Sequence, residues 1–115
     1  MTDPYHTSQI YPASAPEVFA HCLDCLRTIG AKIERSDPEL GLIQADYLVN
    51  LPLVHASHVS LYLLIVPQDE QRCELTIETF GMINQLDRSR PLHKPREVAQ
   101  QVLSRVGDTV RQHRD

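Results

Sequence analysis

Hydrophobic residues recur every three or four positions in two segments, the spacing that places them on one side of a helix. The first segment opens at Ser14-Ala15-Pro16-Glu17, a capping box in which the serine hydroxyl accepts the glutamate amide, and closes at Gly30. The second opens near Pro95, a residue suited to a first helical turn. We predict two amphipathic helices, with core-facing stripes of Ala15, Val18, Phe19, Cys22, Cys25, Leu26 and Ile29 and of Val98, Ala99, Val102, Leu103, Val106, Thr109 and Val110.

Five other segments have the alternation or the short apolar run of a β-strand: 6–11, 32–35, 42–48, 59–66 and 73–78. In 59–66 odd and even positions are both apolar, which predicts a central strand. In 73–78 apolar positions alternate with polar ones, so one face should be covered. We predict one α+β domain spanning 1–115, in which two helices cover one face of an antiparallel sheet of about five strands, in the order β-α-β-β-β-β-α.

Charge and length narrow the classes of function. The chain has 11 basic and 15 acidic residues among 115, a net charge of −4. Nucleic-acid-binding domains usually carry a basic excess, so we expect no nucleic-acid partner. No apolar stretch is long enough to span a bilayer, and residues 1–9 do not form a signal peptide. We therefore expect no membrane span and, if Met1 is the native start, a cytoplasmic location.

The stretch from the first helix through the next two strands resembles a known fold family. The resemblance is carried by Pro16-Glu17-Val18-Phe19, Leu26, Gly30, Ile33, Asp37, Gly41, Ile43 and Ala45. This pattern of helix, glycine stop, strand, Asp–Gly turn and strand resembles small TATA-binding-protein-like domains and the helix-grip domains of the lipoprotein BamC. It implies a fold and carries no catalytic residue. The chain lacks the lipid-attachment cysteine and the paired phenylalanine wedges of those families.

Cys22 and Cys25 form a C-x-x-C, a spacing found in zinc sites and in redox motifs. Cys73 and His21 are the nearest candidates for two further ligands. Cys22, however, lies at the centre of the apolar helix stripe and well inside the helix, where no helix dipole lowers a thiol pKa. We expect all three cysteines to be small buried hydrophobes, with no metal and no cofactor.

Two further patterns contain residue types that are common in catalysis. His55 and His58 form an H-x-x-H with no carboxylate near them in the sequence, as is common for loop histidines. Glu74 and Glu78, four residues apart on a strand, are separated by about 13 Å, too far to act as a pair without a twist. We expect a protein that is not an enzyme.

Apolar residues that the helices cannot cover indicate where binding occurs. Residues 48–54 are rich in Leu and Val where a loop is usually polar. We predict an interaction surface of Leu51, Leu53, Val54, Tyr62 and Leu64, and a protein-binding, self-associating module. The alternative is a small-molecule binder with a pocket between the second helix and the sheet. A candidate ligand or polar face comprises Glu74, Thr76, Glu78 and Tyr47.

Overall fold

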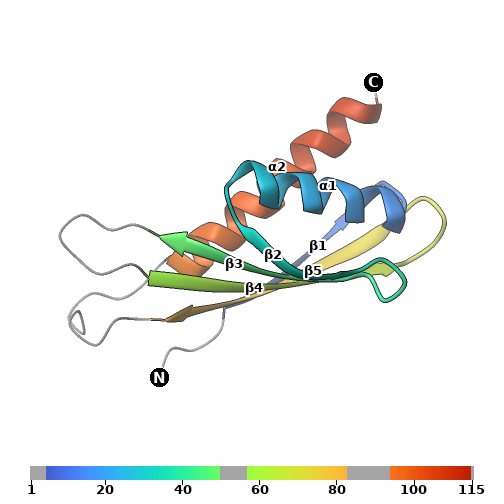
Figure 1. Cartoon of the computed structure of the whole chain (residues 1–115). Coiled ribbons are helices and arrows are strands. Elements are labelled where there is room, and N and C mark those ends of the chain that lie inside the picture. Colours follow the sequence, from blue (N-terminus) through green and yellow to red (C-terminus); the bar gives the residue numbers. More distant parts are fainter. Residues whose placement is uncertain (1–4, 50–56, 83–93, 115) are drawn as a thin grey trace.

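The computed structural model describes residues 5–49, 57–82 and 94–114. Its elements follow the predicted order and form two layers, with both helices above one sheet (Figure 1). Among the described residues no helix is both long and apolar enough to cross a membrane. The elements are β1 (Tyr5–Tyr11), α1 (Ala15–Thr28), β2 (Lys32–Asp37), β3 (Leu42–Val49), β4 (Ser57–Pro67), β5 (Cys73–Met82) and α2 (Lys94–Arg114).

The sheet has the strand order β1-β5-β4-β3-β2, and every neighbouring pair is antiparallel. The predicted central strand is confirmed, because β4 lies in the middle. The strand predicted at 73–78 is longer than its alternation indicated. It continues to Met82, which pairs with His58 of β4. Gly81 therefore lies in the strand, where it pairs with Val59 of β4.

The ends of α1 are fixed by local hydrogen bonds. The Ser14 hydroxyl accepts from the Glu17 amide (3.4 Å) and caps the first turn. At the other end Gly30 has a φ of +86° and donates to the Arg27 carbonyl, while Ala31 donates to the Leu26 carbonyl. This is a Schellman motif, so the predicted glycine stop is confirmed.

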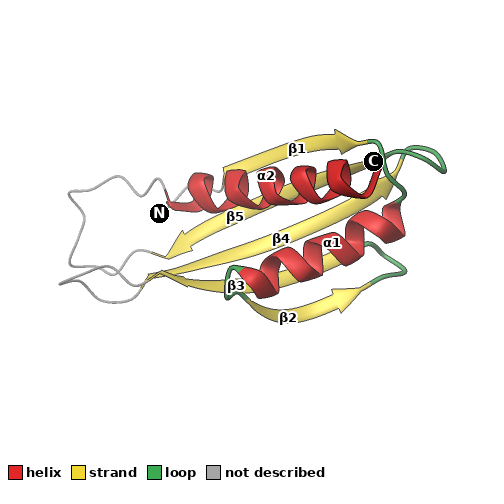
Figure 2. Cartoon of the chain, turned by 90° about the horizontal axis from the view of Figure 1, so that it is seen from above, coloured by secondary structure: helices red, strands yellow, loops and turns green. Residues whose placement is uncertain are grey.

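Side chains fill the space between the helices and the sheet. α1 packs over β2 and β4, and α2 packs over β5 and β1 (Figure 2). A side chain that lines a ligand-sized cavity exposes part of its surface to that cavity, yet the described residues along this interface are almost completely buried. In the described part of α2 and the sheet beneath it, side chains therefore fill the space where the alternative interpretation placed a ligand pocket. The buried residues include Val98, Ala99, Val102, Leu103 and Val106 of α2 and Leu61, Leu63, Leu75 and Ile77 of the sheet.

A tyrosine joins the edge strand β1 to the middle of α2. The Tyr11 side chain is 2% exposed, and its hydroxyl donates to the Leu103 carbonyl at 2.8 Å. Burial raises the pKa of Tyr11, which keeps the hydroxyl protonated and able to donate. A second link lies nearer the surface, where the Gln100 amide donates to the Tyr5 hydroxyl at 2.8 Å. These bonds fix α2 across the β1 edge of the sheet.

Replacing Tyr11 with phenylalanine tests the buried link. Tyr11→Phe removes one buried hydrogen bond while the ring still fills its place, so the free energy of unfolding should fall by about 1 kcal/mol. Tyr5→Phe, at the more exposed bond, should cost less than half as much. Urea unfolding monitored by circular dichroism measures both. Equal losses in the two variants would contradict the assigned role of Tyr11.

Candidate functional site

The sheet face opposite the helices, named the open face, carries side chains in rows across the strands. The register aligns His6, Glu78, Tyr62, Gln44 and Arg35 in one row from β1 to β2. The neighbouring rows are Ser8, Thr76, Leu64, Leu42 and Asp37, and Phe80, Ser60, Asp46 and Lys32.

Apolar side chains on the open face follow the central strand. Tyr62, Leu64 and Val66 of β4 are 38%, 41% and 40% exposed. The Phe80 ring packs edge-on against Tyr62, with centroids 5.7 Å apart. Ile10 and Leu48 are also exposed at opposite ends of this face. No element of the described chain covers these groups, because both helices lie on the other side (Figure 1).

The predicted site residues are brought together only in part. Glu74, Thr76 and Glu78 share the open face with Tyr62 and Leu64, as the alternation predicted. Tyr47 does not join them, because it pairs with Val59 on the helix-facing side and packs against the core. The strand period of two separates Tyr47 from the polar face to which it was assigned. Leu51, Leu53 and Val54 lie outside the described residues.

A pair formed by a histidine and a carboxylate at the end of the open face was missed by sequence reasoning. His58 Nδ1 lies 2.9 Å from Asp46 Oδ2. The two residues belong to adjacent strands, and the register Leu48↔His58 places them diagonally opposite each other. No carboxylate stands near this histidine in the sequence, because the pairing of β3 with β4, and not proximity in the chain, brings Asp46 to it.

A cleft of about 660 Å³ opens at the end of the molecule where α1 begins. The first turn of α1, the β2–β3 turn and the β4–β5 turn meet at this end of the sheet (Figures 1 and 2). Seven of the twelve lining residues are apolar: Ala15, Pro16, Phe19, Pro38, Leu40, Ile65 and Pro67. Leu40 is 61% exposed, unusually open for a leucine that lines a concave surface.

Close backbone packing holds the β2–β3 turn against β4. Gly41 has a φ of +69°, and a Cβ at this position would lie 2.3 Å from the Ile65 carbonyl oxygen. The Ile65 amide donates to the Gly41 carbonyl at 2.8 Å. Asp37 Oδ1 accepts from the amides of Glu39 and Leu40, which closes the turn. Together these contacts fix the position of Leu40 at the cleft.

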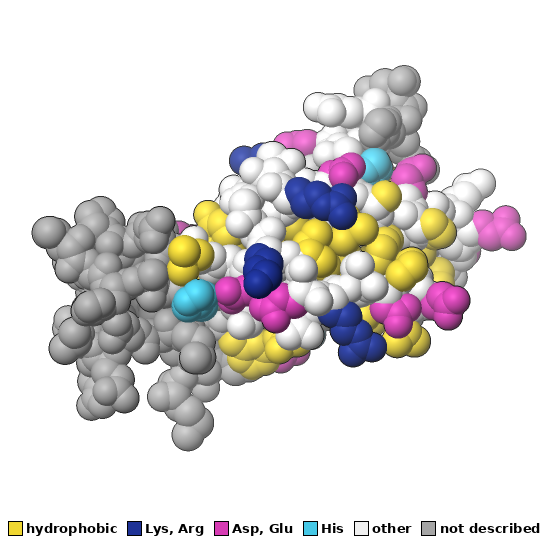
Figure 3. Space-filling model, in the orientation of Figure 1, with side chains coloured by type: hydrophobic (Ala, Val, Ile, Leu, Met, Phe, Trp, Pro, Cys, Tyr) yellow, Lys and Arg dark blue, Asp and Glu magenta, His cyan; other side chains and the backbone are white. Residues whose placement is uncertain are grey.

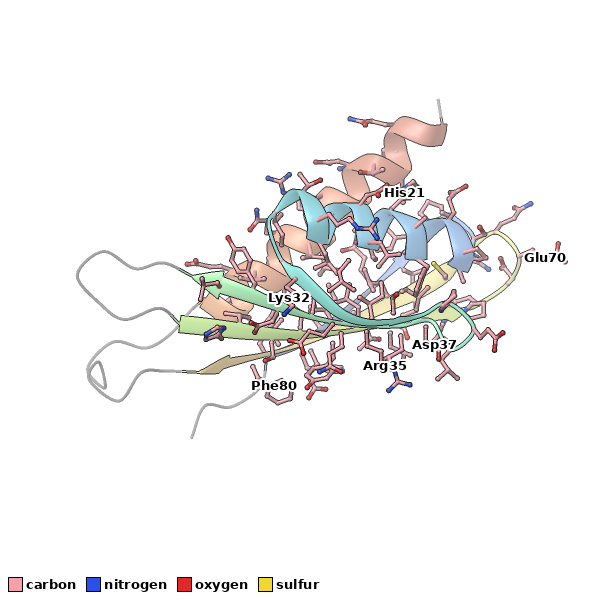
Figure 4. All side chains as sticks on the ribbon, viewed as in Figure 1. His21, Lys32, Arg35, Asp37, Glu70 and Phe80 are labelled. Carbon is pink, nitrogen blue, oxygen red and sulfur yellow. The ribbon has the colours of Figure 1, made fainter. Side chains whose placement is uncertain are left out.

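The acidic groups near the cleft differ in what they already bind. Asp69 accepts from the Gln71 amide and from the Arg72 guanidinium, and these bonds hold the pKa of Asp69 below its usual value. Its carboxylate is thus occupied within the β4–β5 turn. Glu39 and Glu70 also line the cleft, and their carboxylates accept no such bond from the residues that the structure describes. Figure 4 shows Glu70 at the outer end of its turn.

The three cysteines are buried, as their places in the apolar pattern predicted. All are free thiols, and burial raises the pKa of each, that of Cys73 to about 11. Protonated thiols are poor nucleophiles and poor metal ligands near neutral pH. Within the described residues, no group of three His, Cys, Asp or Glu side chains is placed to hold a metal ion.

Charged side chains on the rest of the surface are mixed in sign. Figure 3 shows Lys and Arg interspersed with Asp and Glu on the side in view, with hydrophobic side chains between them. No field of a single sign dominates this side.

Comparison with solved structures identifies the fold as helix-grip, or START-like. A chain of the adenylate sensor from AMP-activated protein kinase, in complex with 5-aminoimidazole-4-carboxamide 1-β-D-ribofuranotide, matches with a TM-score of 0.66 at 13% identity, covering 89% of this chain and 96% of that one. The ZhuI aromatase/cyclase from Streptomyces sp. R1128 matches at 0.60 and 15% identity, covering 100% and 97%.

A START superfamily protein from Mycobacterium smegmatis matches at 0.59 and 12% identity, covering 95% of this chain and 97% of that one. No protein-family model matches the chain, and no curated protein matches its sequence. At these identities the likeness shows the fold alone. The helix-grip part of the expected resemblance is confirmed, whereas these structures give no specific support to the TATA-binding-protein-like or BamC-like part.

Two glycine variants test how the cleft is built. Gly41→Ala should lower the free energy of unfolding by at least about 3 kcal/mol, because it adds a backbone clash to the strain of a positive φ. Gly30→Ala is the matched control, with a similar φ but no atom within 4 Å of the added Cβ, and should cost about 1–2 kcal/mol. Denaturant unfolding measures both. Similar losses would show that the Gly41–Ile65 contact does not constrain the turn.

Proposed function

We propose that the chain is a small-molecule-binding domain of the helix-grip kind, and that its binding site is the cleft beside the start of α1. The observation that carries this proposal is the cleft itself. Its volume of about 660 Å³ falls within the roughly 300–1,000 Å³ typical of ligand sites. Its wall is mainly apolar with a few carboxylates at the rim, the composition that such sites usually have.

The charge around the cleft favours a ligand with an apolar body and a cationic group. The α1 N-terminus contributes about half a positive charge, which Glu17 in the first turn offsets. Arg72 neutralises Asp69. Glu39 and Glu70 remain, so the net potential at the rim is negative. An ammonium group there would gain a charge-assisted hydrogen bond, while a carboxylate would be repelled.

The site is better suited to binding than to catalysis. Among the described residues that line it, the titratable groups are Glu39, Asp69 and Glu70, and the pKa of Asp69 is lowered, which favours the charged form. General acid–base work needs a group poised near the working pH. The solved structures share the fold and include both an aromatase/cyclase and a START superfamily protein. Fold alone does not transfer their activities.

Binding of matched eight-carbon probes tests the proposed site. Octylammonium should bind with a Kd up to about fivefold lower than octanoate, because one exposed charge contact is worth up to about 1 kcal/mol. Leu40→Ser should weaken octylammonium because it removes apolar wall. The double change Glu39→Gln and Glu70→Gln should remove the preference for the amine. Isothermal titration measures the affinities.

Glu34→Gln provides the control for charge, because Glu34 is exposed on β2 and does not line the cleft. It should leave the amine preference unchanged. Octylammonium binding that is the same in wild type, Leu40→Ser and the double glutamine variant would contradict the proposed site.

A second candidate function is protein binding through the open face. The observation that favours it is the exposed apolar strip along β4, with Tyr62, Leu64 and Val66 each about 40% exposed. Contiguous apolar surface of a few hundred Å² often marks an interaction site. The strip is separate from the cleft, so the two functions do not exclude each other.

A further inference from the structure

We propose that the open face binds a second copy of this chain, with a two-fold axis that runs along β4. The inference rests on the second candidate function and names its partner. The two sheets would pack face to face, as in a sandwich, with their strands aligned within about 30°. Residues of β4 would then meet their own counterparts across the axis, with Tyr62 facing Tyr62 and Leu64 facing Leu64.

The charges of the open face are distributed unevenly over its strands. On one side of β4, Glu74 and Glu78 project from β5. On the far side, Lys32 and Arg35 project from β2, at the other edge of the sheet order. Figure 4 shows Arg35 and Phe80 both extending away from the helices. β5 is therefore acidic on this face. The far side carries both signs, because Asp37 lies beside the two cations on β2 and Asp46 of β3 is paired with His58.

The two possible two-fold axes differ in the charges that they bring together. A two-fold axis across the strands would place β5 over β5, so that Glu74 and Glu78 would face glutamates of the other copy. An axis along β4 places β5 over β3 and β1 over β2. Glu78 of each copy then lies near Arg35 of the other copy, and not near a glutamate. Like charges brought together cost free energy, so the second arrangement is favoured.

The register identifies the charge pair that this axis would form. Rotation about an axis along β4 leaves each row at the same position along the strand direction. Glu78 lies in the row of Tyr62, Gln44 and Arg35. In the dimer it faces that same row, opposite Gln44 and beside Arg35 of the second copy. Two such pairs form, one on each side of the axis, because the interface is isologous.

The size of the open face is compatible with a dimer only if most of it is buried. β4 contributes five outward residues, from His58 to Val66, in a sheet of five strands. At strand and residue spacings of about 4.8 Å and 3.4 Å, the face measures roughly 19 Å by 27 Å. Two such faces amount to about 1,000 Å² in total, which is the size of a weak interface. A second sheet covers such an area, whereas a single added strand does not.

Charge reversal at the predicted pair tests the arrangement. Glu78→Arg and Arg35→Glu should each raise the dimer dissociation constant at least about tenfold, because each places like charges together. The double variant should return it to within about threefold of wild type, since the pair is restored with its signs exchanged. Sedimentation equilibrium from micromolar to millimolar protein measures the constants.

Arg96→Glu is the control, because it makes the same charge change on α2, away from the open face. It should leave the dissociation constant within about threefold of wild type. Tyr62→Ser should weaken the dimer by removing the central apolar contact. Thermal unfolding of each variant confirms that it remains folded.

Two outcomes would overturn the proposal. One is a wild-type chain that is monomeric at every concentration, and the other is a dimer indifferent to Tyr62→Ser and to both charge reversals. These outcomes are distinguishable from failure of the underlying function. If the chain were monomeric but bound another protein in a manner lost in Tyr62→Ser, the open face would still be a protein-binding surface and only its assigned partner would be wrong.

Discussion

Two helices can cover only one face of a five-stranded sheet, and this constraint determines where the chain can bind anything. Both helices serve to close the core, where the buried hydrophobic side chains of α2 and Leu61, Leu63, Leu75 and Ile77 of the sheet are each at most 5% exposed. Dense packing of this kind resists the insertion of a ligand, because added volume forces neighbours out of their preferred rotamers. Within the described residues, the room for a ligand or partner therefore lies at the ends of the layers or on the uncovered face.

The cleft follows from how the two layers end. The first turn of α1 and two hairpin turns meet beyond the last rows of the core, where no further side chain of the described residues fills the space between them. Asp37 and Asp69 use their carboxylates to close the turns, and Gly41 lets one turn approach β4 closely. Glu39 and Glu70 are the carboxylates at the rim that do not close a turn. The same contacts that build the cleft thus determine which charges it can offer to a ligand.

Periodicity predicted the layers because a helix stripe and an alternating strand each encode which side is buried. It placed β4 at the centre, both helices on one face and the cysteines in the core. It could not provide the register, on which the His58–Asp46 pair and the Tyr62–Phe80 contact depend. The assignment of Tyr47 to the polar face was wrong, although the alternation of side chains along its own strand puts it on the core side.

The cleft could not be found by periodicity at all. Its walls come from turns and a helix start that are distant in the sequence, and turn residues have no repeating spacing. Leu40 was the available signal, as an apolar residue inside a Pro–Gly turn, but it shares the cleft with Phe19 and Pro67, which are remote from it in the chain. Only the meeting of the turns in three dimensions identifies them as one site.

The most direct test of where this domain binds a ligand is a map of backbone amide chemical shifts on adding octylammonium. Binding at the cleft should shift the amides of Ala15, Phe19, Leu40, Gly41 and Glu70, while the amides of Val98–Val110 stay in place. The largest shifts along Val98–Val110 and the inward positions of β4 would instead show that the ligand enters between α2 and the sheet, and would contradict a binding site at the cleft.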